Sequence, residues 1–149
     1  MEDYDFQRFD WVVLGENTKS EGEIAHILSI GDGEIYSNYV GLIGTHNLCH
    51  SFEECIDDIR PLPLTTDVCE ANLWEKRIDN DYRTVYEYYE DDNIVEISFS
   101  KVSDRIFLRI YVKGNIQIQM PIEYVSDLQH ALNLVKMRKL SRTLKTNID

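Results

Sequence analysis

The chain has 149 residues, with 27 Asp and Glu against 15 Lys and Arg, and a formal net charge of −12. This length allows one compact unit or two small lobes that share a core, and a hydrophobic content of 43% argues against a disordered chain. The strong negative charge suggests a positively charged partner and argues against nucleic acid as a direct ligand.

The charge is unevenly distributed along the sequence. Residues 1–100 hold 23 acidic and 6 basic side chains, a net charge of −17, whereas residues 101–149 hold 4 and 9, a net charge of +5. No apolar run approaches the roughly 18 residues that span a bilayer, so we expect no membrane partner. The first residues are acidic and lack a signal-peptide pattern, which predicts a cytoplasmic protein. The three cysteines lack the spacing of a disulfide framework, so we expect reduced thiols.

The first sixty residues predict a small antiparallel β lobe followed by a short helix. Strand patterns cover residues 10–14, 23–30 and 34–43, and Gly31-Asp32-Gly33 is a strong turn signal. Ser51 and Glu54 have the spacing of a capping box, which predicts a helix ending near Ile59. The prolines that follow require an extended chain, and Thr65 is the expected N-cap of a second short helix.

The second half predicts a four-stranded antiparallel meander, with strands over residues 84–89, 94–99, 105–112 and 116–120. We expect Ile116, Ile118 and Met120 to share one face. An apolar stripe predicts a C-terminal helix from Ile122 to about Met137 that packs on the sheet. The expected class is therefore α+β, divided into residues 1–60, residues 61–137 and a basic, frayed tail over 138–149. That tail could contact nucleic acid, a membrane or the acidic lobe, and a solvated helix end is the default interpretation.

Two stretches carry a resemblance. Pro61-Leu62-Pro63-Leu64-Thr65 running into Trp74, and the helix Tyr124–Leu132, resemble a family of short, largely uncharacterised phage and mobile-element proteins of Bacteroidota-type bacteria. Asp10-Trp11-Val12 is similar to the start of such proteins. Leu73 stands where the family has Gly, and Ser126 where it has His. The resemblance implies an accessory protein acting inside a host bacterium, and it supplies no catalytic residues.

The candidate partner-binding residues are acidic side chains together with tyrosines of one strand. An exposed tyrosine face ringed by carboxylates suits a protein interface, although tyrosine is also a good strand former. The predicted set is Glu53, Glu54, Asp57, Asp58, Tyr86, Tyr88, Glu90, Asp91 and Asp92.

Catalytic and metal sites are not expected. His46, Cys49, His50, Cys55 and Cys69 are the only set that could ligate zinc, but their spacing matches no common zinc module. Cys49 and His50 are adjacent, and adjacent residues seldom face each other as nucleophile and base. We therefore expect no enzyme activity, no metal and no cofactor.

The leading hypothesis is an acidic inhibitor or decoy that occupies a basic, nucleic-acid-binding groove on a host defence protein. An alternative is a protein that sequesters a small nucleotide signal, with Arg105, Arg109 and Lys113 as candidate ligand-binding residues. A third is a structural or assembly role in the element's own particle. The sequence does not fix the oligomeric state.

Overall fold

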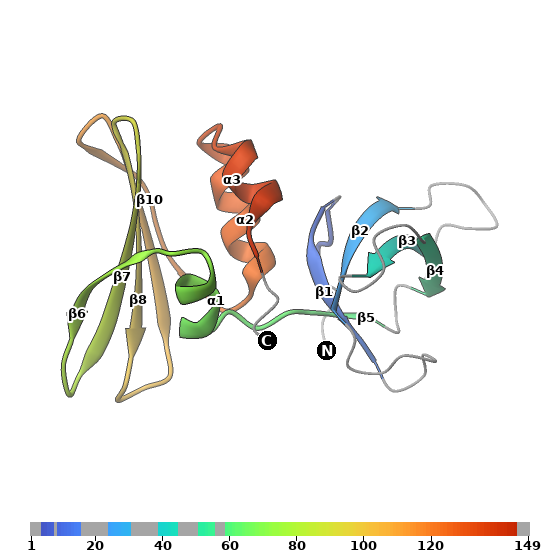
Figure 1. Cartoon of the computed structure of the whole chain (residues 1–149), viewed down its shortest axis with the longest axis horizontal. Coiled ribbons are helices and arrows are strands. Elements are labelled where there is room, and N and C mark those ends of the chain that lie inside the picture. Colours follow the sequence, from blue (N-terminus) through green and yellow to red (C-terminus); the bar gives the residue numbers. More distant parts are fainter. Residues whose placement is uncertain are drawn as a thin grey trace. The chain divides into compact units, whose positions relative to one another are not determined.

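The computed structural model describes residues 4–7, 9–15, 24–30, 39–44, 51–55 and 59–145. The chain divides into two units, Met1–Pro63 and Leu64–Asp149, and each has its own antiparallel sheet (Figure 1). The α+β class is confirmed. Residues 1–63 contain 13 acidic and 3 basic side chains, a net charge of −10, whereas residues 64–149 contain 14 and 12, a net charge of −2.

The first unit contains a five-stranded sheet with the order β4-β3-β2-β1-β5. Its strands are β1 (Trp11–Leu14), β2 (Ile24–Ile30), β3 (Tyr39–Gly44), β4 (Ser51–Cys55) and β5 (Ile59–Pro61). Apolar side chains of three strands form a buried cluster, against which Phe6 packs. The cluster comprises Val12, Leu14, Ala25, Ile27 and Ile59.

The helix predicted from Ser51 is wrong. Ser51–Cys55 is strand β4, in which Phe52 pairs with Leu42 of β3. A capping box is a local signal, and here a ladder to a distant strand satisfies the same backbone groups. With β4 and β5 added, the lobe has five strands rather than the three that the sequence predicted.

The second unit is a five-stranded meander with the order β10-β9-β8-β7-β6. Its strands are β6 (Glu75–Asp79), β7 (Arg83–Glu90), β8 (Asn93–Ser100), β9 (Ile106–Val112) and β10 (Asn115–Ile122). Four of them match the predicted strands. The fifth, β6, was missed because Ile78 is its only apolar residue, so it shows no alternation.

The two edges of this sheet differ. The edge strand β6 is charged at four of its five residues. The other edge strand, β10, has no charged residue but contains Pro121 and a bulge between Ile116 and Ile118. Across the bulge, Ile116 pairs with Tyr111 and Ile118 with Ile110, so the two isoleucines lie on opposite faces. The expectation that they share a face is therefore wrong.

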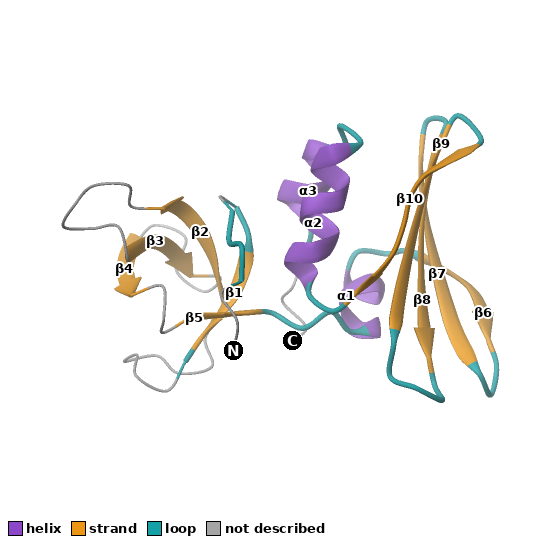
Figure 2. Cartoon of the chain, turned by 180° about the vertical axis from the view of Figure 1, so that it is seen from behind, coloured by secondary structure: helices purple, strands orange, loops and turns teal. Residues whose placement is uncertain are grey.

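Three helices lie on one side of this sheet (Figure 2). They are α1 (Thr66–Ala71), α2 (Val125–Leu134) and α3 (Arg138–Thr143). Ile122 belongs to β10, so the predicted helix over 122–137 is too long at both ends. Among the described residues, no helix has the length and apolar content needed to cross a membrane.

Both α1 and α2 end in the same turn. At the end of α1, the amide of Leu73 donates to Glu70 and that of Trp74 to Cys69; Lys136 and Met137 donate in the same way to Asn133 and Leu132 of α2. This is the Schellman pattern, whose left-handed position favours glycine. Leu73 (φ 60°) and Lys136 (φ 65°) occupy that position here.

The predicted frayed tail is also wrong over its described part, because residues 138–145 are held by two pairs of hydrogen bonds. The Gln129 amide donates to the carbonyl of Ser141, whose hydroxyl donates to the carbonyl of Gln129. The Asn72 amide donates to the carbonyl of Lys145 (2.8 Å) and accepts from the amide of Lys145 (2.7 Å). These contacts attach residues 141–145 to α2 and to the end of α1.

Candidate partner-binding surface

Strand register assigns the tyrosines of β7 to two faces of the sheet. Tyr86 pairs with the buried Ile97 and is 1% exposed, and burial raises its pKa to about 12. Tyr88 is half-buried, with its ring 5.5 Å from that of Trp74. Tyr86 therefore belongs to the core and cannot contact a partner. The exposed tyrosine of this strand is Tyr89 (48% exposed), on the opposite face.

We call the face of the sheet that carries Tyr89 the open face. The core residues Tyr86, Ile97 and Leu108 lie on the other face. Four residues of the open face pair successively across four strands and form what we call the tyrosine row: Tyr89, Ile94, Tyr111 and Ile116. With neighbouring strands about 4.8 Å apart, the row is about 14 Å long. Its two ends, Tyr89 and Ile116, are exposed, and its middle is half-buried. The row is thus an apolar and aromatic stripe with accessible ends.

A glutamate row runs beside it. Glu75 pairs with Glu87, and Glu87 pairs with Glu96, so like charges lie opposite each other on three strands, an arrangement that destabilises a sheet. Two arginines offset the repulsion. Arg77 lies 3.4 Å from Glu75 and 3.3 Å from Glu87, and Arg109 lies 3.2 Å from Glu96.

Hydrogen bonds and ring contacts connect the charged row to its aromatic neighbours. The Tyr89 hydroxyl donates to the Glu87 carboxylate at 2.8 Å, and this bond to the neutral phenol is the main reason that the pKa of Tyr89 is raised. The Arg109 guanidinium lies 5.2 Å from the centre of the Phe107 ring. The exposed Tyr89 ring is therefore anchored by its hydroxyl to a carboxylate.

The tyrosine row begins at an acidic turn, Glu90-Asp91-Asp92, which connects β7 to β8. Asp91 has a left-handed backbone (φ 53°), and Asp91 and Asp92 are exposed. The amide of Lys113 donates to the carbonyl of Asp92, which brings the β9–β10 turn alongside. Asp91 and Asp92 thus lie at the Tyr89 end of the open face. Glu90 accepts from the Tyr88 hydroxyl at 3.5 Å and belongs to the face that carries Tyr86 and Tyr88.

The other predicted acidic residues belong to the first unit. Glu53 and Glu54 are in β4, and Asp57 and Asp58 lie outside the described residues.

The candidate ligand-binding cations Arg105, Arg109 and Lys113 are spread along β9. Arg105 precedes the strand, Arg109 is within it and Lys113 follows it. Eight residues of extended chain place Arg105 and Lys113 about 27 Å apart. The three side chains therefore do not surround a common ligand.

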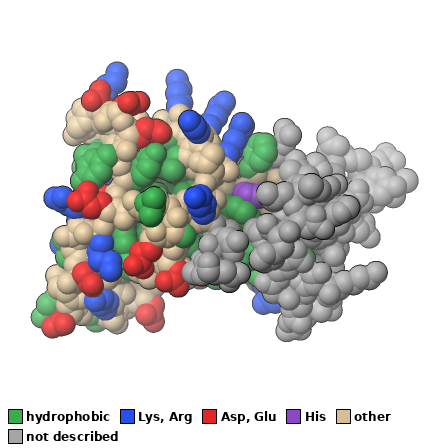
Figure 3. All heavy atoms as spheres, viewed as in Figure 1, with side chains coloured by type: hydrophobic (Ala, Val, Ile, Leu, Met, Phe, Trp, Pro, Cys, Tyr) green, Lys and Arg blue, Asp and Glu red, His purple; other side chains and the backbone are tan. Residues whose placement is uncertain are grey.

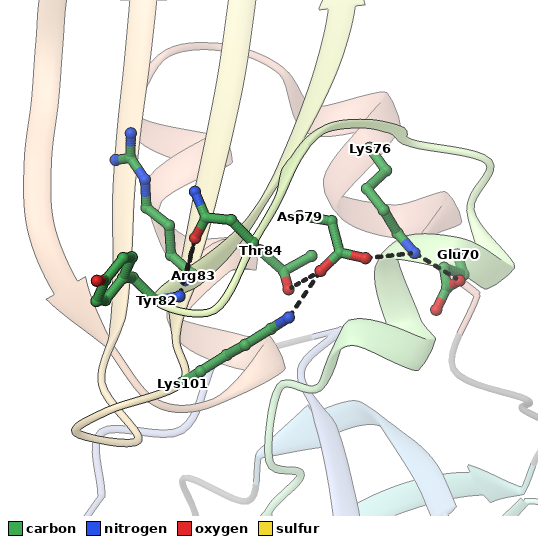
Figure 4. A network of polar contacts seen from close by, with 8 residues as sticks. Glu70, Lys76, Asp79, Tyr82, Arg83, Thr84 and Lys101 are labelled. Atoms are coloured by element: carbon green, nitrogen blue, oxygen red, sulfur yellow. Dashed lines mark hydrogen bonds and ion pairs between the residues drawn. The ribbon is translucent and has the colours of Figure 1, made fainter.

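The opposite end of the sheet carries a polar network (Figure 4). Asp79 accepts from Lys101 at 2.8 Å and from Thr84 at 3.2 Å, and Lys76 lies between Asp79 (3.9 Å) and Glu70 (3.8 Å). The hydrogen bond from Lys101 is the first cause of the lowered pKa of Asp79. Glu70, Lys76, Asp79 and Lys101 are all paired, and these contacts fasten α1 and the β8–β9 loop to β6.

The metal-ligating and nucleophilic side chains of the described residues lie apart or are buried. Within them, no three His, Cys, Asp or Glu side chains are grouped so as to hold a metal ion. His46, Cys49 and His50 lie outside the described residues. Cys69 is 2% exposed, and burial raises its pKa to about 12, so it stays a thiol and is a poor nucleophile.

Comparison of the chain with protein-family models, curated proteins and solved structures finds no match. The surface therefore has to be interpreted from its own chemistry. Tyr89, Ile94, Tyr111 and the glutamate row were not among the predicted partner-binding residues. Alternation assigned each residue to a face of its own strand, but only the register between strands shows that they form continuous rows.

Proposed function

We propose that the chain is a non-enzymatic binding protein whose open face docks on a basic protein surface. The observation that carries this proposal is the tyrosine row with its exposed ends, bordered by the glutamate row and by the acidic turn. Aromatic side chains are enriched in protein interfaces, and tyrosine offers contact area at low cost in conformational entropy. The exposed carboxylates of Asp91 and Asp92 at its Tyr89 end favour a partner with Lys and Arg.

The charge of the whole chain supports a basic nucleic-acid-binding groove as the partner surface. The first unit has a net charge of −10, which would accelerate encounter with such a groove and would compete with phosphates for it. The resemblance of residues 61–74 and 124–132 to phage and mobile-element proteins favours a host protein as the target. An inhibitor or decoy role is the function that these features support best.

An affinity capture from host lysate at 50 and 500 mM salt tests the proposal. The test variants are Tyr89→Ser with Ile116→Ser, and Asp91→Asn with Asp92→Asn. Matched controls at the other end of the sheet are Tyr82→Ser with Val102→Ser, both exposed, and Asp81→Asn with Asp104→Asn. Each acidic pair contains one left-handed residue, Asp91 or Asp104, and changes the net charge equally.

We expect the first apolar pair to abolish capture of a nucleic-acid-binding protein at either salt concentration, and its control to leave capture intact. The first acidic pair should weaken capture at 50 mM salt more than its control does. Capture that is indifferent to salt and survives the Tyr89 and Ile116 changes would contradict the proposal.

A further inference from the structure

A second charged surface lies on the helices. Five cationic side chains between the end of α2 and the end of the described chain are exposed, and no Asp or Glu occurs between residues 128 and 145. We call them the cation patch: Lys136, Arg138, Lys139, Arg142 and Lys145. Lys and Arg side chains project as a group from the upper edge of the helical region (Figure 3). The cation patch is positively charged, whereas the chain as a whole has a net negative charge.

The helix α3 separates its cations from its buried side chains. At about 100° per residue, Arg138, Lys139 and Arg142 fall within an arc of about 100°. Leu140 and Ser141 fall on the opposite side and are buried. The hydrogen bonds of Gln129 with Ser141 and of Asn72 with Lys145 hold this segment at the middle of α3 and just beyond its end. The cations are therefore presented on a fixed frame.

Helix stability does not account for their positions. Arg138 and Lys139 lie in the first turn of α3, where the helix dipole is positive and disfavours cations, and that turn has no acidic residue. Lys136 occupies a left-handed position that favours glycine, at a cost of roughly 1 kcal/mol. Lys136, Arg138 and Lys139 therefore occupy positions where other residue types would make the fold more stable.

Carboxylate pairing does not account for them either. On the sheet, Lys76, Arg77, Lys101 and Arg109 all form ion pairs with Asp or Glu. In the part of the chain that the structure describes, Lys136, Arg138 and Lys139 form none. Asp127 is separated from Lys136 by the length of α2, about 14 Å, which exceeds the Debye length of about 8 Å at physiological salt.

The surroundings of the patch identify the chemistry of its ligand. A helix that binds a membrane surface needs an exposed apolar face. Here Met137, Leu140 and Leu144 are buried. Within the described segment 130–145, Leu134 is the one large apolar side chain that is exposed. A protein interface needs an apolar or aromatic centre, which is also missing from this segment. Closely spaced cations without such a centre suit the phosphates of a nucleic-acid backbone.

We propose that the cation patch binds the phosphate backbone of nucleic acid without base specificity. The net charge of −12 argues against such a ligand, but this charge is concentrated in residues 1–63. If all five cations engage phosphates of a single strand, the slope of log K against log salt is about −3.5. The proposal is independent of the open face, because the helices lie on the other side of the sheet.

Fluorescence anisotropy of a labelled 20-nucleotide single strand, measured with the full chain at 25–200 mM salt, tests this. The test variant combines Lys136→Gln, Arg138→Gln and Lys139→Gln. The control combines Arg83→Gln, Arg105→Gln and Lys113→Gln, which are exposed residues of the second unit and change the net charge equally. We expect the test variant to lose at least tenfold in affinity and about two units of salt slope. The control should lose less than twofold.

Two single changes separate binding from folding. Lys136→Gly relieves a left-handed residue, and Lys139→Glu places an acid in the first turn of α3, so each should raise the midpoint of urea unfolding. Each should nevertheless weaken binding to the oligonucleotide. Equal losses in the test and control triple variants would overturn the proposal. So would no binding of the wild-type chain at 25 mM salt, or binding of phosphatidylserine vesicles but not of the oligonucleotide.

Discussion

Leu73 combines a left-handed backbone with a side chain that is 89% exposed. It lies at the left-handed position of the turn that ends α1, where glycine avoids the clash of Cβ with the backbone. The side chain contributes little burial in return. This residue is therefore a local source of strain within an otherwise regular turn.

We expect Leu73→Gly to raise the free energy of unfolding by about 1 kcal/mol, measured by urea denaturation. Leu134 is a matched control, because it is 79% exposed but lies in the last turn of α2. Leu134→Gly should lower the same quantity by up to about 1 kcal/mol, because glycine is a poor helix former. Changes of the same sign in both variants would contradict this account.

His26, in the described part of the first unit, has an environment that disfavours its charged form. Its ring stacks on Trp11, its Nδ1 donates to the carbonyl of Phe9 at 3.2 Å, and burial lowers its pKa below 6.5. The imidazole of His26 therefore binds a proton more readily in the unfolded chain than in the folded chain. The free energy of unfolding should fall as the pH drops below about 6.5, and above that pH His26 should make no pH-dependent contribution.

The variant His26→Phe keeps an aromatic ring on Trp11 and removes the proton. Its free energy of unfolding between pH 7.5 and 5.5 should therefore depend less on pH than that of the wild type. An identical pH dependence of the two chains would show that His26 remains neutral or equally protonated in both states.

At the scale of elements, the connection between α1 and the end of the chain depends on one side chain. Asn72 makes two hydrogen bonds with the backbone of Lys145 and a third with the carbonyl of Val68. The helix α3 has six residues, too short to be stable alone, so this contact and the pairing of Gln129 with Ser141 hold it in place.

Asn72→Ala removes all three hydrogen bonds and should destabilise the second unit by about 1–3 kcal/mol. The amides of residues 141–145 should then exchange with solvent faster, while those of β8 and β9 stay protected. Asn72→Asp keeps the acceptor for the Lys145 amide but turns a carboxylate oxygen toward the carbonyls of Val68 and Lys145, so it should also speed exchange over these residues. Unchanged exchange over residues 141–145 in Asn72→Ala would refute the proposed attachment.

Some elements could be predicted from sequence and others could not, for identifiable reasons. Strands β7 to β10 alternate apolar and polar residues because one face is buried, and that pattern is local. Strand β6 and the strand at Ser51–Cys55 are fixed by pairing with neighbours, which leaves no local signal. The apolar stripe from Ile122 to Val135 continues across the end of β10, so it concealed where the strand stops and the helix starts.

The candidate surface shows the same limit. The acidic turn follows from a run of polar residues between two strands and was predicted. The tyrosine and glutamate rows depend on pairing across four strands, so the sequence analysis selected the buried Tyr86 instead of Tyr89. The cation patch was visible as a basic segment, but its ordered frame depends on Asn72 and Gln129, which are distant in sequence.

At the scale of the whole molecule, the two units have separate cores. The first is built on Val12, Leu14 and Ile27, whereas Ile97, Leu108 and Ile110 form the centre of the second sheet. The short extended stretch at Pro61–Leu64 connects the two units. Their stabilities should therefore be separable.

A fragment of residues 64–149 should fold alone and unfold cooperatively, as followed by circular dichroism, because it contains the complete β6–β10 sheet and its three helices. Its net charge of −2 should also weaken its retention on an anion exchanger relative to the full chain. A fragment without a cooperative transition would show that the second unit needs the first for stability.

The edge of β10 has a consequence for the behaviour of the protein at high concentration. Because no charge repels an incoming strand there, the bulge at Gln117 and the missing amide of Pro121 are what keep this edge from acting as a template. Deleting Gln117 would preserve both neighbouring pairs, Ile116 with Tyr111 and Ile118 with Ile110, and would make the strand regular. Combined with Pro121→Val, this deletion should make the chain form thioflavin-binding fibrils faster than the wild type does.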